Sequence, residues 1–239
     1  MANKSLYVRS NYQVNQTPQF KVLSSDQCEE AYLSALEVLE RTGADIFSAE
    51  ALNLFANGGC WVEGNRVRFP SHIVEMAVQT VPSRVVISNR KGERAIFLEG
   101  QNNFVGPSMG GNFVLDPISG ERREFQKSDY QQTALVADAL PNIDFVSGVG
   151  GCSFGDLVKN TTKPIIQKVN NVKQCEKILK IAAAVTGSSE SVRRSPFFIF
   201  QIASTSPLSG SGEAMDQVIF AAQNRVPVIY ATQAFSGDL

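Results

Sequence analysis

The sequence predicts an α/β protein: a partial TIM (β/α) barrel preceded by an N-terminal α+β extension. In the second half of the chain, short apolar runs alternate with amphipathic helical segments, which is the pattern of βαβ units and a parallel sheet. The later strands of this array start about 30 residues apart, which matches one unit of a (β/α)8 barrel. In the first half, capped helices are followed by short strands, and the turns between them are rich in glycine, asparagine and proline.

The composition is typical of a globular protein with a substantial core. Of the 239 residues, 43% are hydrophobic, and 22 basic side chains nearly balance 23 acidic ones. This near-neutral charge, with no basic run that contains interleaved aromatics, argues against a nucleic-acid partner. No apolar stretch approaches the ~20 residues of a membrane span, and the N-terminus lacks the apolar centre of a secretory signal. We therefore expect a cytoplasmic protein with neither a membrane nor a nucleic-acid partner.

Cysteine and histidine are sparse, and their spacing indicates no metal site. The residues concerned are Cys28, Cys60, Cys152, Cys175 and His72. No two cysteines form a CxxC pair, and none has a metal-ligand spacing with the histidine. Cys28 and Cys175 fall on apolar stripes of expected helices, so we expect both to be small buried hydrophobes.

Three helices are expected in the first third of the chain, after a non-periodic arm over residues 1–23. The first begins with Ser24 and Gln27 at the spacing of a capping box. Its apolar residues recur at intervals of three and four, which places them on one face: Cys28, Tyr32, Ala35, Leu36 and Leu39. The second helix is expected over Ser48–Asn57 and the third over Pro70–Thr80.

Short strands are expected between and after these helices. The candidates are Arg66–Phe69, Arg84–Ser88, Ala95–Leu98, Asn103–Val105 and Phe113–Leu115. Residues 24–126 are therefore expected to form helices followed by an antiparallel sheet. A further helix is expected to open at Ser128, with Gln131 at the capping-box distance, and to end at Pro141.

The strand–helix array follows. Its strands are expected at 143–147, 164–167, 197–203 and 226–231, and its helices at 172–186 and 212–224. The strand starts are 21, 33 and 29 residues apart, and the first interval leaves little room for a crossover helix. We divide the chain into a helical and antiparallel β region (1–140) and a partial parallel β/α barrel of about four strands (141–239).

A glycine-rich loop over residues 148–153 follows the first strand of the array. A dinucleotide-binding loop would need GxGxxG and an acidic residue at the end of the next strand. Here Ser153 replaces the third glycine, and the next strand leads to Lys168, Val169 and Asn170. The interpretation of the chain as an NAD-dependent oxidoreductase therefore rests on a weak motif alone.

Polar residues without charge gather where the strands of the array end, which is where a barrel forms its site. The candidate substrate-binding residues are Gln167, Asn170, Gln201, Ser204, Tyr230, Thr232 and Gln233. No carboxylate pair and no histidine lies among them, so the pattern favours holding a polar substrate rather than general acid–base catalysis. Tyr230 could also face a cation through its ring. Taken singly, each of these residues is more often an ordinary loop residue with satisfied hydrogen bonds.

Several ordered segments resemble the trimethylamine methyltransferase family of corrinoid-dependent methylamine and betaine methyltransferases. The resemblance runs from about residue 24 to the end, over segments that include Leu36–Ala44, Phe104–Pro107, Phe113–Asp116, Ser119–Arg123, Ala137–Asp144, Asn160–Pro164, Ser206–Leu208 and Val226–Val228. The chain corresponds to the N-terminal half of the family's sequence. The stretch from Phe154 to Asn160 looks shorter than in the family, and the region that carries pyrrolysine in some members is absent.

The resemblance implies a TIM barrel with an N-terminal extension and a methyltransferase activity. Family members move a methyl group from a methylated amine, such as trimethylamine or glycine betaine, to the cobalt of a corrinoid protein. The cobalamin cofactor would then belong to that partner, and no cofactor would be bound directly by this chain. No catalytic residue of the family is placed on this half.

The alternative is a truncated, non-catalytic binding or remnant protein that keeps half of the fold. An open parallel sheet exposes its edges and apolar faces, which favours self-association. With either function we expect a homo-oligomer.

Overall fold

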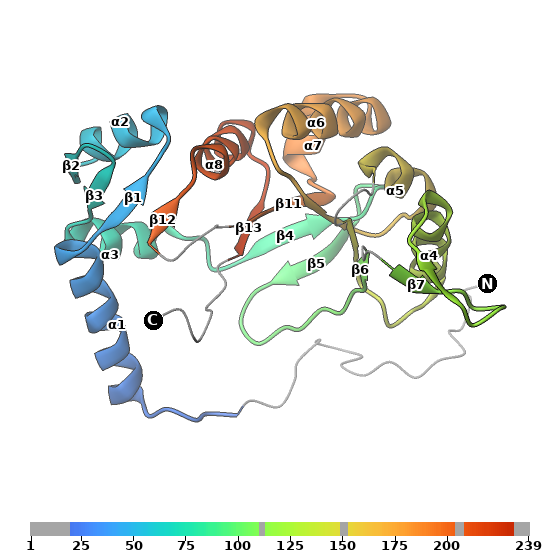
Figure 1. Cartoon of the computed structure of the whole chain (residues 1–239), viewed down its shortest axis with the longest axis horizontal. Helices are drawn as coiled ribbons and strands as arrows, with labels where there is room; N and C mark the ends of the chain where they lie inside the picture. The colour runs from blue at the N-terminus through green and yellow to red at the C-terminus, as the bar shows by residue number, and fades with distance from the viewer. Residues whose placement is uncertain (1–19, 110–112, 149–152, 204–207, 232–239) are drawn as a thin grey trace.

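A five-stranded parallel sheet forms the centre of the molecule, and helices cover one of its faces (Figure 1). The computed structural model describes residues 20–109, 113–148, 153–203 and 208–231. The strands lie in the order β13-β11-β10-β9-β6, and every neighbouring pair is parallel. The bounds are β6 (Ser108–Met109), β9 (Val146–Gly148), β10 (Ile165–Lys168), β11 (Phe198–Ala203) and β13 (Val228–Ala231). The four predicted parallel strands are thus confirmed, and β6 is a fifth strand that the prediction missed.

The helices of the array follow these strands in turn. They are α4 (Lys127–Ala139), α5 (Phe154–Asn160), α6 (Val172–Thr186), α7 (Ser189–Arg194) and α8 (Gly212–Asn224). The predicted bounds of α6 and α8 are confirmed, whereas the short α5 and α7 were not predicted. The prediction for the start of α4 is wrong, because Gln126 is the N-cap residue and Asp129 completes the capping box, two residues before Ser128 and Gln131.

The N-terminal helices agree with the prediction within one residue. They are α1 (Ser25–Arg41), α2 (Ala49–Asn57) and α3 (Ser71–Thr80). The capping box of Ser24 and Gln27 is present at α1. Cys28, however, is exposed, so its predicted burial is wrong. Leu36 is the buried residue of α1, because this helix contacts α3 and β3 (Arg66–Arg68) while its first turns lie away from the rest of the protein.

The predicted antiparallel sheet of the first half is wrong as a single unit. Its strands form a small sheet of order β12-β1-β3-β2 and two separate hairpins, β4-β5 and β7-β8. The bounds are β1 (Ala44–Ile46), β2 (Trp61–Glu63), β4 (Val85–Ser88), β5 (Arg94–Leu98), β7 (Phe113–Leu115), β8 (Arg122–Glu124) and β12 (Ser209–Gly210). No strand forms over 103–105, because the backbone N–H and carbonyl of Val105 bond to Asp144 instead.

The small sheet connects the two halves of the sequence. β12 comes from the second half and pairs in parallel with β1, where Asp45 lies opposite Ser209. Beneath this sheet, Ile46 and Val67 pack with Met215 and Ile219 of α8. The N-terminal helices are thereby anchored to the helix that precedes β13.

Alternation along the strands divides the central sheet into two faces. Ile165, Phe198 and Phe200 pack toward the helices in the largest hydrophobic core. Ile166 and Ile199 pack on the opposite face, against Ile87 and Ile96 of the β4-β5 hairpin. Both faces are therefore covered near the amino ends of β10 and β11, as expected for parallel strands made of continuous apolar residues.

Candidate functional site at the carboxyl ends of the parallel strands

The order of the parallel strands brings their carboxyl ends to one rim. Gln167 lies opposite Gly148 on one side and Phe200 on the other, while Gln201 lies opposite Ile229. Among the described strands of this parallel sheet, the spatial order follows the chain without a reversal. A dinucleotide-binding sheet places its ligand where the strand order reverses, so these strands lack the feature that such a site requires. Residues 149–152 of the glycine-rich loop lie outside the described residues.

Gln167 is the most deeply buried of the described candidate substrate-binding residues. Its side-chain Nε2 donates to the backbone carbonyls of Gly148 at 3.2 Å and Lys168 at 3.1 Å. These two acceptors fix the orientation of the amide. The side-chain Oε1 is then left without a hydrogen-bond partner in the part of the chain that the structure describes. A buried acceptor without a partner is uncommon in folded proteins and calls for an explanation.

Gly148 makes the room that the Gln167 side chain occupies. A Cβ atom at this position would lie 2.5 Å from Oε1 of Gln167 and 2.8 Å from Cδ1 of Leu157. Both distances are shorter than van der Waals contact. A larger residue here would therefore displace the amide group of Gln167.

A cavity of about 190 Å³ opens beside Gln167, between α5 and α6. Its described lining residues are Ser153, Phe154, Gln167, Lys168, Asn170, Gln174, Lys177, Ile178 and Ile181. Of the four residues from α6, Lys177 and Ile178 lie three and four positions after Gln174, and Ile181 lies three positions after Ile178, so all four share one face of that helix. Asn171 caps α6 through its side chain, and Oε1 of Gln174 accepts from the backbone N–H of Asn170 at 2.8 Å.

The described part of the lining offers groups that can bind a ligand, but neither a carboxylate nor an imidazole that could act as a general base. Among its described residues there is no acidic side chain and no histidine. Lys168 and Lys177 supply positive charge, Phe154 supplies an aromatic ring, and Gln167 supplies an acceptor. This chemistry suits recognition and positioning of a small molecule.

The structure brings two of the candidate residues, Gln167 and Asn170, together at the cavity. Gln201 is half-buried and lies opposite Lys168, one position beyond the pair formed by Gln167 and Phe200. By alternation, its side chain belongs to the other face of the sheet. Tyr230 is half-buried against the helix-side core, and burial raises the pKa of its phenol. Ser204, Thr232 and Gln233 lie outside the described residues.

Seven of the described lining residues were not among the sequence candidates: Ser153, Phe154, Lys168, Gln174, Lys177, Ile178 and Ile181. The signal for two of them was present in the sequence. Gln174 and Lys177 lie three and six residues after the N-cap residue Asn171, on the stripe that continues to Ile178 and Ile181. A helix that directly follows a strand end directs its first turns toward the rim, and this pattern could have identified both.

A polar clasp attaches the end of α4 to the start of β10. Nζ of Lys163 donates to the backbone carbonyls of Ala137, Leu140 and Ile143 at 2.5–2.6 Å. Burial alone would raise the pKa of Asp138, but the net shift is downward because its carboxylate accepts hydrogen bonds from Thr161 and Thr162. The clasp thus fixes the strand that carries Gln167 to the neighbouring helix.

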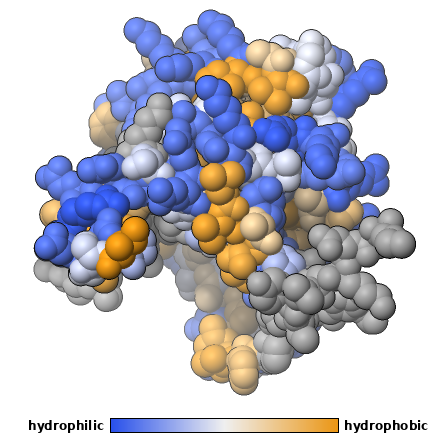
Figure 2. All heavy atoms as spheres, turned by 90° about the vertical axis from the view of Figure 1, so that its right-hand side faces the viewer, coloured by the Kyte–Doolittle hydropathy of each residue, from blue (hydrophilic) through white to orange (hydrophobic). Residues whose placement is uncertain are grey.

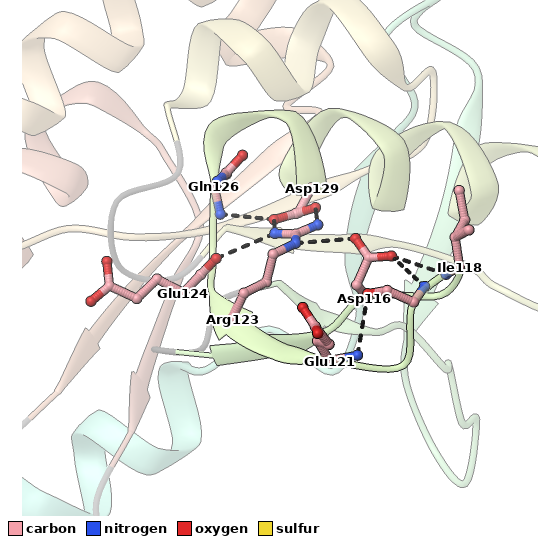
Figure 3. Close-up of polar contacts among 8 residues, drawn as sticks. Asp116, Ile118, Glu121, Arg123, Glu124, Gln126 and Asp129 are labelled. Carbon is pink, nitrogen blue, oxygen red and sulfur yellow. Dashed lines mark hydrogen bonds and ion pairs between the residues drawn. The ribbon is translucent and has the colours of Figure 1, made fainter.

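A second polar cluster fixes the β7-β8 hairpin to the first turn of α4 (Figure 3). Arg123 binds Asp129 through two parallel hydrogen bonds of 2.8 and 2.9 Å, and its Nε donates to Asp116 at 3.2 Å. Hydrogen bonds from Arg123 and from the backbone N–H of Gln126 lower the pKa of Asp129 to about 2. Backbone N–H groups of Ser119 and Ile118, together with Arg123, lower the pKa of Asp116. The hairpin follows β6, whose carboxyl end belongs to the same rim.

The described residues contain no group of three or more His, Cys, Asp or Glu side chains that could hold a metal ion. Cys175 is buried as predicted, and burial raises the pKa of its thiol to about 12. The described helices include none that is long and apolar enough to cross a membrane.

Comparison with known proteins gives a consistent result over nearly the whole chain. The family model described as trimethylamine methyltransferase (MTTB) matches residues 2–238. The trimethylamine methyltransferase MttB of Desulfitobacterium hafniense (strain DSM 10664 / DCB-2) is 31% identical over 228 residues, which cover 90% of this chain and 46% of that protein. The glycine betaine methyltransferase of Desulfitobacterium hafniense (strain Y51) is 24% identical, with 92% of this chain and 48% of that protein covered. The trimethylamine methyltransferase MttB of Methanosarcina thermophila is 24% identical, with 92% and 49% covered. The chain spans about half the length of these relatives.

Proposed function

Because the chain belongs to the trimethylamine methyltransferase family, we propose that it forms part of an enzyme that moves a methyl group from a methylated amine to the cobalt of a corrinoid protein. The chain spans about half the length of its relatives, and the activity is proposed for this chain or for the assembly that it forms. The observation that carries the proposal is the parallel strand order, which gathers neutral polar groups and a cavity at one rim.

In this reaction, the chain has to bind the methylated amine and position it. The partner's corrinoid would supply Co(I), a strong nucleophile for the N-methyl carbon. A quaternary ammonium releases a neutral amine when it loses a methyl group, so this chain needs no general acid for that step. Its residues have to hold the cation, exclude water and align one N-methyl bond, and alignment alone lowers a barrier substantially. The absence of acidic side chains and histidine among the described lining residues is compatible with this division of labour.

The substrate-binding role falls on the residues at the ends of the parallel strands. We assign it to Gln167, Asn170, Gln201, Ser204, Tyr230, Thr232 and Gln233. The described members of this set present amide groups and a phenol, which can contact a cation without covalent chemistry.

We further propose that the five parallel strands are consecutive strands of a TIM barrel. Their spatial order follows the chain in one direction, and α4, α5, α6 and α8 contact one another in sequence on one face. Each strand of a closed (β/α)8 barrel is likewise placed beside the previous one, with the helices outside. In such a barrel the functional site forms at the carboxyl ends of the strands. The cavity lies at the carboxyl end of β10, on the side of the sheet that the helices cover.

Methyl transfer can be tested by following the visible spectrum of a corrinoid protein reduced to Co(I). The chain is mixed with this protein and with trimethylamine, glycine betaine or other methylated amines. We expect one amine to convert the Co(I) spectrum into that of methylcobalamin, and we expect no conversion when this chain is omitted. If no methylated amine gives the change, the proposed activity of this chain is refuted.

The second candidate function is a non-catalytic protein that associates with itself. In the described part of the sheet, β6 and β13 each pair on one side only, and an unpaired strand edge can accept another strand. Large apolar residues are also exposed on α4 and the β7-β8 hairpin, including Leu135 and Ile118. Figure 2 shows apolar patches among hydrophilic residues on the side of the molecule that faces right in Figure 1. Light scattering tests this candidate: we expect a dimer or larger species, and a monomer at all concentrations would exclude self-association.

A further inference from the structure

The first helix, α1, carries an apolar face that the described part of the protein covers only at one end. This face begins at Cys28 and Tyr32 and continues one turn later to Leu36, the buried residue of the helix. Tyr32 is 42% exposed, and Cys28 is exposed as well. The covered end is the last part of α1, where the carbonyl of Leu39 accepts from the backbone N–H of Phe69. The first turns, which lie apart from the rest of the protein in Figure 1, therefore present an apolar surface without a partner in the described residues.

The remaining surface of α1 is acidic. From Val22 to Glu40 the sequence has no basic residue. The single basic residue of the helix, Arg41, pairs with Glu37 at 2.7 Å. The exposed carboxylates of the helix are those of Asp26, Glu29, Glu30, Glu37 and Glu40. A polypeptide segment that covers the apolar face is therefore expected to combine apolar side chains with positive charge.

The N-terminal arm of this chain, residues 1–23, has that composition. It contains three basic residues and no acidic residue. The basic residues are Lys4, Arg9 and Lys21, and the large apolar residues near the first two are Leu6, Tyr7, Val8, Tyr12 and Val14. The 17 residues of α1 extend over about 26 Å, which about eight residues of extended chain can span. Residues 4–14 are therefore long enough to cover the helix.

We propose that the N-terminal arm of one copy of this chain lies along the exposed face of α1 in a second copy, with the two copies exchanging their arms reciprocally. The described end of the arm favours a second copy over the same chain. Phe20 is 90% exposed and Val22 is 91% exposed, so neither packs against α1. Residues 20–23 also lead away from this helix (Figure 1). The arm thus leaves its own α1 in a direction that suits exchange.

Reciprocal exchange would give a closed dimer with two-fold symmetry, in which the same contact forms twice. Each contact alone is short. The second contact, however, forms within the complex that the first has created, so its effective concentration is high. This surface differs from the strand edges of β6 and β13, and the inference does not depend on methyl transfer.

Sedimentation equilibrium tests the exchange on the 239-residue chain and on a variant that lacks residues 1–19. We expect the complete chain to form a dimer and the shortened variant to be a monomer at the same concentration. Raising the salt concentration should weaken the dimer, because exposed charges are screened. A complete chain that is monomeric at all concentrations, or equal dissociation constants for the two proteins, would overturn the inference.

A matched pair of double variants tests the charge complementarity. Lys4→Glu with Arg9→Glu reverses two charges of the arm, while Lys173→Glu with Lys180→Glu reverses two exposed charges on α6. We expect the arm variant to raise the dissociation constant of the dimer at least about tenfold, and the α6 variant to leave it unchanged. Equal effects of the two double variants would contradict the proposed contact.

The thiol of Cys28 reports whether the exposed face of α1 is covered. Labelling with a maleimide can be followed by mass spectrometry of the peptide that contains α1, and Cys28→Ser identifies the signal. We expect slower labelling of Cys28 in the dimer than in the variant that lacks residues 1–19. Equally fast labelling in a dimer would place the dimer contact elsewhere. Slow labelling in a monomer would show that each arm covers its own helix, and either result would overturn the exchange.

Discussion

At the end of β10, the side chain of Gln167 occupies space that the neighbouring strand leaves open at Gly148. The sequence identified Gln167 and Asn170 as candidates because both follow an apolar strand. Position alone could not show that Gln167 is buried, or that its Nε2 has two acceptors while its Oε1 has no partner among the described residues. That property depends on Gly148 and Leu157, which reach the site from another strand and a helix. Lys177 was missed because the prediction considered only residues at strand ends, whereas Lys177 lies on the face of α6 that borders the cavity.

Gly148→Ala should perturb the cavity, and Gly155→Ala should not. The new methyl group at residue 148 would lie 2.5 Å from Oε1 of Gln167, so we expect the amide to move and ligand affinity to fall about tenfold. At residue 155 a Cβ would meet its nearest atom, Oγ of Ser153, at the ordinary distance of 3.6 Å. Calorimetric titration of both variants with the ligand that binds the unmodified chain provides the measurement. Equal affinities in the two variants would refute the role of Gly148.

Asp129 makes the stability of the β7-β8 attachment dependent on pH. Its pKa is about 2 in the folded protein and about 3.9 in an unfolded chain. A lowered folded pKa means that its contribution is fully present above about pH 4 and is lost as the pH falls toward 2. We expect Asp129→Asn to be less stable than the unmodified chain in urea unfolding at pH 6, and this difference to shrink between about pH 4 and pH 2. A difference that stays constant over that range would show that ionised Asp129 contributes nothing.

Helices were predictable where the capping residue and the apolar face agreed. Ser48, Asn171 and Ser211 each accept from a backbone N–H three residues on, and the helices they cap match the prediction within one residue. At α4 the structure has Gln126 and Asp129 in place of the predicted Ser128 and Gln131, and Arg123 also binds the Asp129 carboxylate. The two-residue strands β6 and β12 were missed because their pairing partners, β9 and β1, lie far away in the sequence.

The contribution of the Lys163 clasp to the attachment of α4 to β10 can be tested directly. Lys163→Met removes the donor from three backbone carbonyls, and we expect it to lower the free energy of unfolding by roughly 2 kcal/mol. Lys159→Met is the control, because Lys159 is exposed near the end of α5 and such surface changes usually stay within about 0.5 kcal/mol. Chemical denaturation of both variants gives the comparison. If both lose the same stability, the clasp does not hold the two elements together.

On the scale of the whole molecule, the arrangement of the parallel strands was the most predictable feature. Alternation of apolar strands and helices predicted parallel pairing in chain order, and β9, β10, β11 and β13 pair in this way. The sequence could not reveal that β6 extends this sheet or that the β4-β5 hairpin covers its second face, because both depend on contacts between distant segments. The resemblance to the family, carried by motifs spread along the chain, agrees with the match over residues 2–238.

In the proposed function, the carboxyl ends of the parallel strands hold a methylated amine for transfer of one methyl group. Methylated amines with isotope-labelled methyl groups, incubated with this chain and a corrinoid protein reduced to Co(I), test it most directly. Mass spectrometry should find the label on the corrinoid and an equal amount of the amine with one methyl group fewer. Loss of both products in Gly148→Ala but not in Gly155→Ala would locate the transfer at the cavity. If the label stays entirely on every amine in the presence of the unmodified chain, the proposed methyl transfer is refuted.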